Sequence, residues 1–323
     1  MAPDLPDAAT DPLARLLAGD GCIVLDGALA TELQARGCDL DDPLWSARVL
    51  LERPELIYRV HRDYFEAGAQ CAITASYQAT PQGFATRGLD LAQSRRLIRR
   101  SAELAQQARA DHLQVHPDAG PLLVAGSIGP YGACLADGSE YRGDYALPRE
   151  RMLAFHRPRM AALADAGVDL LACETQPSAP EIDALLGLLE EFPAMRAWFT
   201  FTLRDATHLS DGTPLADVVA RVQANPQVVA LGINCIALER VEDALAHLAS
   251  LTRLPLVAYP NSGERYDAAD KTWHADPGAT GTLAGCASSW RAAGARLIGG
   301  CCRTTPRDIA ALAMRLHPAK DDA

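Results

Sequence analysis

The stretch that decides the fold reads Ala295-Arg296-Leu297-Ile298-Gly299-Gly300-Cys301-Cys302. It is a short apolar run that ends in two adjacent thiols, and such runs are typical of strands buried on both faces of a parallel sheet. Seven further candidate strands precede it, most of them continuous apolar runs. The eight predicted strands cover residues 21–28, 70–77, 122–128, 170–175, 197–203, 228–235, 255–261 and 295–302.

Helical patterns lie between the predicted strands, at residues 54–67, 93–110, 149–165, 180–190, 214–224, 239–251, 283–293 and 306–316. The last has a clear start signal, with Thr305 as N-cap, Pro306 at the first helical position and Asp308 at N3. Because strand and helix alternate eight times, we predict an α/β protein with a single (β/α)8 TIM barrel over residues 19–318. Residues 1–18 are expected to form a short disordered or loosely ordered tail. A doubly wound open sheet is the alternative, although neither GxGxxG after the first strand nor a P-loop is present.

Composition narrows the function classes. The 323-residue chain has a net charge of −11, which disfavours nucleic acid and anionic membranes as partners. No segment approaches the roughly 18 apolar residues of a membrane span, and the N-terminus does not resemble a signal peptide. Nine cysteines without such a leader favour free thiols in a reducing compartment. We therefore expect a cytoplasmic protein that acts on small molecules. Since no dimerisation arm follows the last helix, we expect a monomer.

Polar and reactive residues gather at the predicted C-terminal strand ends, where a (β/α)8 barrel carries its active site. Isolated serines or threonines there are expected simply because loops begin at strand ends. The start of a loop does not readily explain why two carboxylates, Asp26 and Glu174, and three thiols are all expected at one mouth of the barrel. The residues at these ends are Asp26, Gly27, Thr74, Ser76, Tyr77, Ser127, Glu174, Thr175, Thr202, Arg204, Asn234, Cys235, Asn261, Cys301 and Cys302.

Three of these residues, Cys235, Cys301 and Cys302, are candidate metal ligands. Three thiolates on Zn²⁺ with a fourth position open describe a catalytic rather than a structural zinc site. The alternative is three unrelated buried cysteines, because free Cys often behaves as a small hydrophobic residue. Their common position at strand ends favours the metal site.

At this point the chain resembles a known family, the homocysteine S-methyltransferases. The resemblance spans residues 21–316 and rests on motifs that arrive in the family's order: Asp26-Gly27, Cys173-Glu174-Thr175, Gly232-Ile233-Asn234-Cys235, Tyr259-Pro260-Asn261-Ser262-Gly263-Glu264 and Gly299-Gly300-Cys301-Cys302-Arg303-Thr304. It implies that Cys235, Cys301 and Cys302 bind zinc and that the zinc holds the thiol of homocysteine. It also implies a sulfonium methyl donor, such as S-methylmethionine or S-adenosylmethionine, and methionine as the product.

Recognition of an amino acid requires an anion for its ammonium group and donors for its carboxylate. We predict Glu174 as the first choice for the ammonium and Asp26 as the second, with the backbone at Asp26-Gly27 sharing the role. The predicted donors to the carboxylate are Thr74, Ser76 and Asn234. Two structural alternatives stay open: Asp26 as a turn or cap residue, and Glu174 in an ion pair with Arg204.

The cationic donor suits an aromatic face, for which Tyr77 at a strand end is the preferred candidate. Other aromatic residues lie in the two long loops, 129–148 and 262–282, and are interpreted mainly as side chains that pin these loops. These residues are Tyr141, Tyr145, Tyr266 and Trp273.

Other functions stay open from the sequence. Betaine is an alternative donor, and selenocysteine or another thiol is an alternative acceptor. A different class is a non-catalytic zinc or redox module in which Cys301 and Cys302 cycle to a disulfide. Such a module would not require Asp26, Glu174 and Asn234 at the same mouth.

Overall fold

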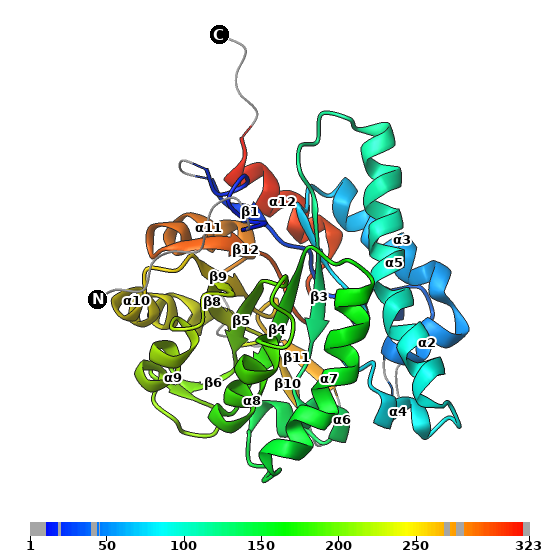
Figure 1. The fold of residues 1–323 in the computed structure, drawn as a ribbon. Coiled ribbons are helices and arrows are strands. Elements are labelled where there is room, and N and C mark those ends of the chain that lie inside the picture. Colours follow the sequence, from blue (N-terminus) through cyan, green and yellow to red (C-terminus); the bar gives the residue numbers. More distant parts are fainter. Residues whose placement is uncertain are drawn as a thin grey trace.

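The computed structural model of the chain describes residues 11–18, 21–39, 44, 46–267, 272–275 and 281–318. Eight parallel strands form its main sheet in the order β1-β12-β9-β8-β5-β4-β3-β2, and a parallel bridge between Leu25 and Cys71 brings β1 to β2 (Figure 1). The predicted (β/α)8 barrel is therefore confirmed, and the doubly wound alternative is wrong. The strands are β1 (Ile23–Val24), β2 (Cys71–Ile73), β3 (Leu123–Ile128), β4 (Leu170–Gln176), β5 (Ala197–Phe201), β8 (Val228–Asn234), β9 (Leu256–Tyr259) and β12 (Ala295–Ile298).

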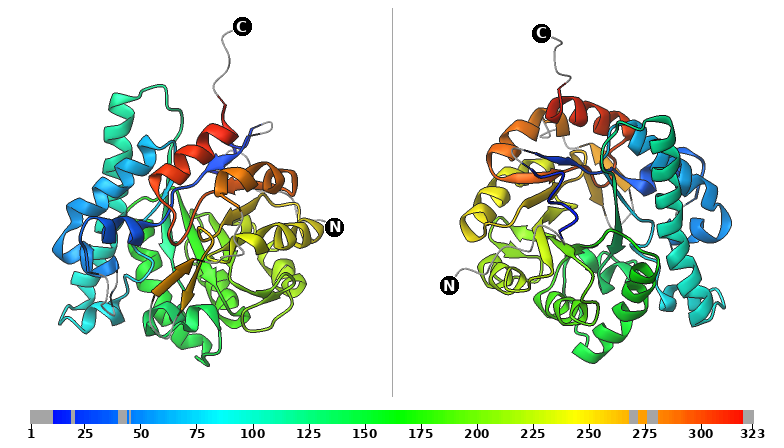
Figure 2. Two further views of the ribbon diagram at one scale, coloured as in Figure 1. Left: turned by 180° about the vertical axis from the view of Figure 1, so that it is seen from behind. Right: turned by 45° about the horizontal axis from the view of Figure 1, so that its top comes forward.

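The eight predicted helices are all present and surround the strands, as Figure 2 shows. The predicted start of the last helix is confirmed, since Thr305 and Asp308 form a capping box. None of the described helices is long and apolar enough to cross a membrane. The helices are α3 (Pro54–Glu66), α5 (Leu91–Val115), α7 (Arg149–Asp165), α8 (Ala179–Leu189), α9 (Leu215–Val222), α10 (Val241–Leu251), α11 (Leu283–Ala292) and α12 (Pro306–Leu316).

Short elements that the sequence did not predict decorate the loops after the strands. The predicted strand 197–203 ends at Phe201, and a small antiparallel hairpin follows it. Elements this short give too few residues for a period of 2 or 3.6 to be recognised. They are α1 (Leu29–Ala35), α2 (Ser46–Glu52), α4 (Pro81–Ala85), α6 (Tyr131–Leu135), η1 (Ser139–Tyr141), η2 (Leu238–Arg240) and the hairpins β6 (Leu203–Asp205) with β7 (His208–Leu209) and β10 (Glu264–Asp267) with β11 (Thr272–Ala275).

Side chains alternate between the inside of the barrel and the layer under the helices. On β3, for example, Leu123 and Ala125 belong to the interior cluster, whereas Val124 packs in the outer one. Both layers are buried, which explains the continuous apolar runs. Leu13 is fully buried in the interior cluster, so the N-terminal segment contributes to the packed barrel. The domain boundary at residue 19 stays a prediction.

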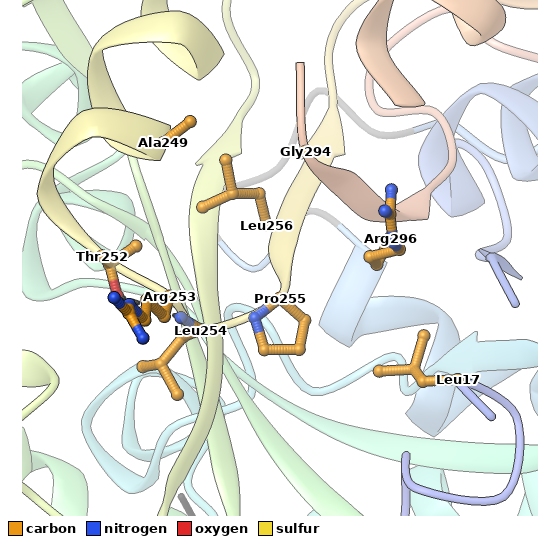
Figure 3. A pocket seen from close by; sticks show the side chains of 9 residues that line it. All are labelled: Leu17, Ala249, Thr252, Arg253, Leu254, Pro255, Leu256, Gly294 and Arg296. Atoms are coloured by element: carbon orange, nitrogen blue, oxygen red, sulfur yellow. Dashed lines mark hydrogen bonds between the residues drawn. The ribbon is translucent and has the colours of Figure 1, made fainter. Parts of the chain in front are cut away.

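A cavity of about 330 Å³ lies at the N-terminal end of the barrel (Figure 3). Its lining includes Pro255 and Leu256 at the start of β9 and Gly294 just before β12. The active sites of (β/α)8 enzymes lie at the opposite, C-terminal end. The functional site is therefore expected at the other mouth of the barrel.

Candidate metal centre and substrate site

The three predicted metal ligands meet at the C-terminal mouth. Cys235 follows β8, and Cys301 and Cys302 follow β12. The Sγ atom of Cys302 lies 3.7 Å from that of Cys235 and 4.0 Å from that of Cys301, and all three thiols are free. A tetrahedral ion with Zn–S bonds of about 2.3 Å separates its sulfurs by about 3.8 Å. The three side chains thus fit a thiophilic metal ion that keeps one coordination position open.

The backbone around Cys235 is held in an uncommon conformation. Cys235 has φ of +54°, and its N–H donates to the carbonyl oxygen of Tyr259 at 3.1 Å. Thr175, directly after Glu174, has φ of +60°. Such left-handed conformations are costly for residues other than glycine and cluster at functional sites.

Asn234 stabilises this conformation at Thr175. Its Oδ1 accepts the Thr175 N–H at 2.8 Å, and its Nδ2 donates to Thr175 Oγ1 at 2.8 Å. The Asn234 side chain therefore couples the end of β8, which is followed by Cys235, to the end of β4, which carries Glu174. The Asn234 amide carries two hydrogens, and this pair of bonds uses one of them.

Gly299 and Gly300 bring the thiols after β12 against the end of β1. A Cβ on Gly299 would lie 2.6 Å from Leu25 Cβ, and one on Gly300 would lie 2.3 Å from Thr304 Oγ1. The Gly300 N–H donates to the carbonyl oxygen of Asp26 at 3.0 Å. Only glycine fits this approach, which explains why two glycines precede the paired cysteines.

Thr304 fixes the loop that carries Cys301. Its hydroxyl donates to the carbonyl oxygen of Cys301 at 2.6 Å and accepts the N–H of Ala28 at 3.1 Å. Gly27 is packed against the same threonine, because a Cβ there would lie 2.8 Å from Thr304 Oγ1. The structure thus gives Gly27 a close-packing role, and its predicted role in binding substrate stays a prediction.

The two carboxylates predicted to bind an ammonium group are both buried at the mouth. Ser127 Oγ donates to Glu174 Oε1. Burial raises the pKa of Glu174 to about 7, although hydrogen bonds from Ser127 and Tyr259 oppose the rise. Burial likewise raises the pKa of Asp26 well above its ordinary value, with the N–H of Ile73 opposing at 2.9 Å from Oδ2. A cationic group is the natural partner for two desolvated carboxylates.

The alternative ion pair between Glu174 and Arg204 is wrong. The guanidinium group of Arg204 is exposed and lies 3.7 Å from Asp205 instead. Asp26 also has structural contacts, although they are not those of the turn or cap alternative: its Oδ2 accepts the N–H of Ile73 on β2, and its carbonyl oxygen accepts the N–H of Gly300.

Thr74 and Ser76 already use their hydroxyl hydrogens within the fold. Ser76 Oγ donates to the carbonyl oxygen of Ser127 at 2.8 Å, so in the 2.7 Å contact between the two hydroxyls Thr74 is the donor. The Ser127 N–H in turn donates to Thr74 Oγ1 at 3.0 Å. In this arrangement both residues brace β2 against β3. Their predicted role as donors to a substrate carboxylate stays a prediction and requires a rotation of these hydroxyls.

Residues of the loop after β3 reach the metal centre, which the sequence analysis underestimated. The Tyr141 hydroxyl lies 3.4 Å from Cys235 Sγ, so interpreting this tyrosine mainly as a loop pin is wrong. Tyr145 does serve such a role, because its hydroxyl donates to Glu181 on α8. Tyr266 and Trp273 pair in the β10–β11 hairpin, but their side chains lie outside what the structure describes.

A buried cation supports the loops that follow β2 and β3. Arg159 on α7 is fully buried and donates to the carbonyl oxygens of Tyr77 and Gly129. The His156 ring lies between Arg159 and Glu181, with His156 Nε2 2.7 Å from Glu181 Oε1. Tyr77, the predicted donor-binding aromatic residue, is thus held through its backbone by a side chain behind the site.

The remaining cysteines lie away from the metal centre, as predicted. Cys173 packs in the outer core cluster, on the face of β4 opposite to Glu174. Cys134 lies in α6 and is partly buried, rather than exposed in a loop. A second cluster on the outside of the barrel joins Glu66, His112 and His116. Its glutamate also pairs with Arg62 at 3.2 Å, and it has no link to the mouth.

Hydrogen bonds among the three clustered thiols favour one thiolate even without an ion. Donation from Cys301 and Cys302 lowers the pKa of Cys235 well below its ordinary value. Donor atoms that are already partly deprotonated bind metal cations more readily at neutral pH. The cluster therefore has both the spacing and the charge that a metal ion requires.

Comparison with known proteins agrees with this site. The family model described as homocysteine S-methyltransferase matches residues 23–316. The chain is 66% identical over 305 residues to the homocysteine S-methyltransferase of Escherichia coli (strain K12), covering 94% of this chain and 98% of that protein. It is 43% identical over 308 residues to a selenocysteine Se-methyltransferase of Brassica oleracea var. italica, covering 92% and 89%. Among solved structures, the homocysteine methyltransferase MmuM from Escherichia coli in its metallated form matches with a TM-score of 0.86 and 63% identity, covering 94% of this chain and all of that one. The motifs, the fold and these matches agree, and the chain belongs to the homocysteine S-methyltransferase family.

Proposed function

We propose that this protein transfers a methyl group from a sulfonium donor to the thiol of homocysteine and so forms methionine, with Zn²⁺ held by Cys235, Cys301 and Cys302. The observation that carries the proposal is the cluster of three free thiols at tetrahedral spacing beside two buried carboxylates. The family of the chain and the named activities of its relatives support the reaction class. The related crystal structure is of a metallated form, which supports a bound metal ion in this protein. The donor set consists of three sulfur atoms, which supports zinc as that ion.

Bound zinc would supply a deprotonated thiol at neutral pH, whereas a free alkyl thiol with a pKa of about 8.5 is mostly protonated. The protein must then orient the rest of the amino acid. Glu174 lies at the end of β4 with Ser127 and Tyr259 around its carboxylate, and it is our choice for the ammonium group. Asp26 is the second choice, and the free amide hydrogen of Asn234 is a candidate donor to the substrate carboxylate.

The methyl transfer requires no general acid, because the leaving group does not need to be protonated. The homocysteine thiolate sulfur forms a bond to the methyl carbon while the bond from that carbon to the donor sulfonium breaks. The electron pair of the broken bond stays on the donor sulfur, which leaves as a neutral thioether. The protein therefore needs to align the sulfur, carbon and leaving sulfur and to exclude water, and it needs no proton donor at the leaving group.

Selenocysteine as acceptor stays a second candidate, because a relative named for that activity covers most of the chain. A selenol of the same shape would occupy the same position. Betaine as donor has no separate observation in its favour. The redox-module alternative does not explain why two carboxylates, Asp26 and Glu174, are buried at the same mouth as the thiols.

The test is formation of methionine by reduced, zinc-loaded protein from homocysteine and S-methylmethionine with an isotopically labelled methyl group, followed by mass spectrometry. We expect labelled methionine, and we expect it to be lost on chelation. Cys302→Ser should lose both bound zinc and turnover, whereas Cys286→Ser, at a partly buried thiol on α11, should retain both. Zinc is counted in a His116→Ala background, so that the surface cluster does not contribute.

Two results would contradict the proposal. One is full activity of Cys302→Ser. The other is no methyl transfer to homocysteine from S-methylmethionine, S-adenosylmethionine or betaine. The monomeric state and the cellular location stay predictions.

A further inference from the structure

The segment after β3 folds over the metal ligands and places one acidic side chain beside them. Glu140 and Tyr141 belong to the 3₁₀ turn η1, which Arg142 closes. The turn is anchored to the barrel because Thr202 Oγ1 donates to the carbonyl oxygen of Glu140 at 3.2 Å. It is also packed tightly on α6, since a Cβ on Gly132 would lie 2.6 Å from the backbone nitrogen of Glu140. The backbone of Glu140 is therefore held at the mouth by Thr202 on one side and by Gly132 of α6 on the other.

The carboxylate of Glu140 is incompletely satisfied. Its Oε2 atom is buried and forms no hydrogen bond with any residue that the structure describes. A buried carboxylate oxygen without a partner is costly, and native proteins retain such groups chiefly where a ligand completes them. The unpaired Oε2 atom of Glu140 therefore requires an explanation.

The charges around Glu140 make a cation the missing partner. The neighbours that act on its charge include Cys235 and Asp137, which are both negative when ionised. The neighbouring guanidinium group, on Arg142, is about half exposed and already lies 3.0 Å from Asp144 and 3.8 Å from Asp137. The mouth of the barrel thus has an excess of negative charge next to the thiols.

Two tyrosines complete the walls of this region. Tyr141 reaches to 3.4 Å from Cys235 Sγ, and the Tyr77 hydroxyl is close enough to Glu140 to be affected by its charge. Aromatic faces stabilise sulfonium and quaternary ammonium cations. Glu140, Tyr77 and Tyr141 therefore form a set with the chemistry of a cation site, and Tyr141 brings it into contact with the thiol of Cys235.

We propose that Glu140, with Tyr77 and Tyr141, forms the subsite for the positively charged methyl donor. This inference rests on the proposed function and adds to it the residue that recognises the donor's charge. A sulfonium amino acid carries a net charge of +1 at neutral pH and suits this site. Betaine is net neutral, and its carboxylate is one methylene from the cationic nitrogen, so Glu140 would repel it. Glu140 thereby favours sulfonium donors over betaine.

The role is distinct from that of Glu174. Glu174 lies at the end of β4 and accepts a hydrogen bond from Ser127 on β3. Glu140 comes instead from η1, in the loop after β3. The methyl acceptor and the methyl donor would thus each meet a different carboxylate.

The experiment measures binding of S-methylmethionine and of homocysteine, each separately, to zinc-loaded protein by calorimetry. Loss of one charge-assisted contact is expected to weaken S-methylmethionine binding roughly 10- to 100-fold in Glu140→Gln. Homocysteine binding should change less than about twofold. Glu150→Gln, which changes an exposed acid in the first turn of α7, is the matched control and should leave both affinities nearly unchanged.

A second pair of variants tests the aromatic wall. Tyr141→Phe keeps the ring and should retain most of the donor affinity, whereas Tyr141→Ala should lose it. Zinc content and the thermal midpoint are measured for every variant, so that a folding defect is recognised.

Three outcomes would overturn the inference: unchanged donor affinity in Glu140→Gln, an equal loss for homocysteine, or a wild-type protein that binds homocysteine but no sulfonium compound. Failure of the proposed function would appear differently, as normal binding of both ligands without methionine formation.

Discussion

Glu174→Gln is expected to stabilise the metal-free, reduced protein at pH 8 far more than at pH 5. The carboxylate is 7% exposed, and its burial raises the pKa to about 7 from an ordinary value of 4.5. Below pH 4.5 the group is protonated in both the folded and the unfolded chain. Between pH 4.5 and 7 the folded chain holds one proton more than the unfolded chain, so the free energy of unfolding falls as the pH rises.

The size of the effect follows from the two pKa values. The complete change from 4.5 to about 7 corresponds to about 3 kcal/mol. About 2.5 kcal/mol of this falls between pH 5 and pH 8. Glutamine has no ionised form and keeps an oxygen that can accept the hydrogen bond from Ser127. The variant should therefore escape this loss of stability while keeping much of the local structure.

Urea denaturation, with chelator and reductant present, measures the difference in free energy of unfolding between Glu174→Gln and the wild type. It is carried out at pH 5 and at pH 8. Glu150→Gln, exposed on the first turn of α7, controls for the removal of a negative charge as such. The reasoning fails if Glu174→Gln changes the free energy of unfolding equally at both pH values. The stabilised variant should also bind homocysteine more weakly, because the predicted partner of the ammonium group has lost its charge.

Three further substitutions test other parts of the structure. Gly300→Ala places a Cβ 2.3 Å from Thr304 Oγ1, so we expect bound zinc, measured by elemental analysis, to fall sharply, and full retention would contradict the packing argument. Buried His61 has a pKa lowered to about 4 by burial. Stability should thus fall as the pH falls below 6.5, and His61→Leu should raise the free energy of unfolding about 2 kcal/mol more at pH 5 than at pH 8. Arg159→Lys should lower that free energy by about 3 kcal/mol or more in denaturation experiments, because two loop carbonyls lose their donor. Arg157→Lys, which changes a half-exposed ion pair, should cost less than about 1 kcal/mol, and a similar cost for both variants would refute the role of Arg159.

The sequence predicted the barrel and the convergence of the three thiols because both depend on strong local signals. Apolar runs of strand length recur with amphipathic helices between them, and the barrel topology then brings all the strand ends to one mouth. Cys235 and Cys301 are far apart in the chain, yet each lies within three residues of the end of a strand. Predicting that the two thiols lie close together therefore required only the correct fold class. It did not require knowledge of any loop conformation.

The parts of the site that the sequence did not predict depend on loop geometry and on side-chain pairing. Glu140 lies in a loop, and no period in the sequence places it above Cys235. The two hydrogen bonds between Asn234 and Thr175 depend on a left-handed residue, which a β-branched side chain does not suggest. Thr74 was predicted from its position alone, and position does not show that its hydroxyl is used by the neighbouring strand.

The pairing of β1 with β12 has a consequence for biosynthesis. The first strand leaves the ribosome early, but its neighbour in the sheet is the last to be made. Cys235 follows β8, a strand made between these two, so a nascent chain that lacks β12 and the residues after it offers one of the three thiols instead of a chelating set. The metal can be captured in its final geometry only after nearly the whole polypeptide has been synthesised and the sheet has closed. Prematurely terminated chains would therefore lack metal at this site, and the occupancy of the site would report on the completeness of the polypeptide as well as on its folding.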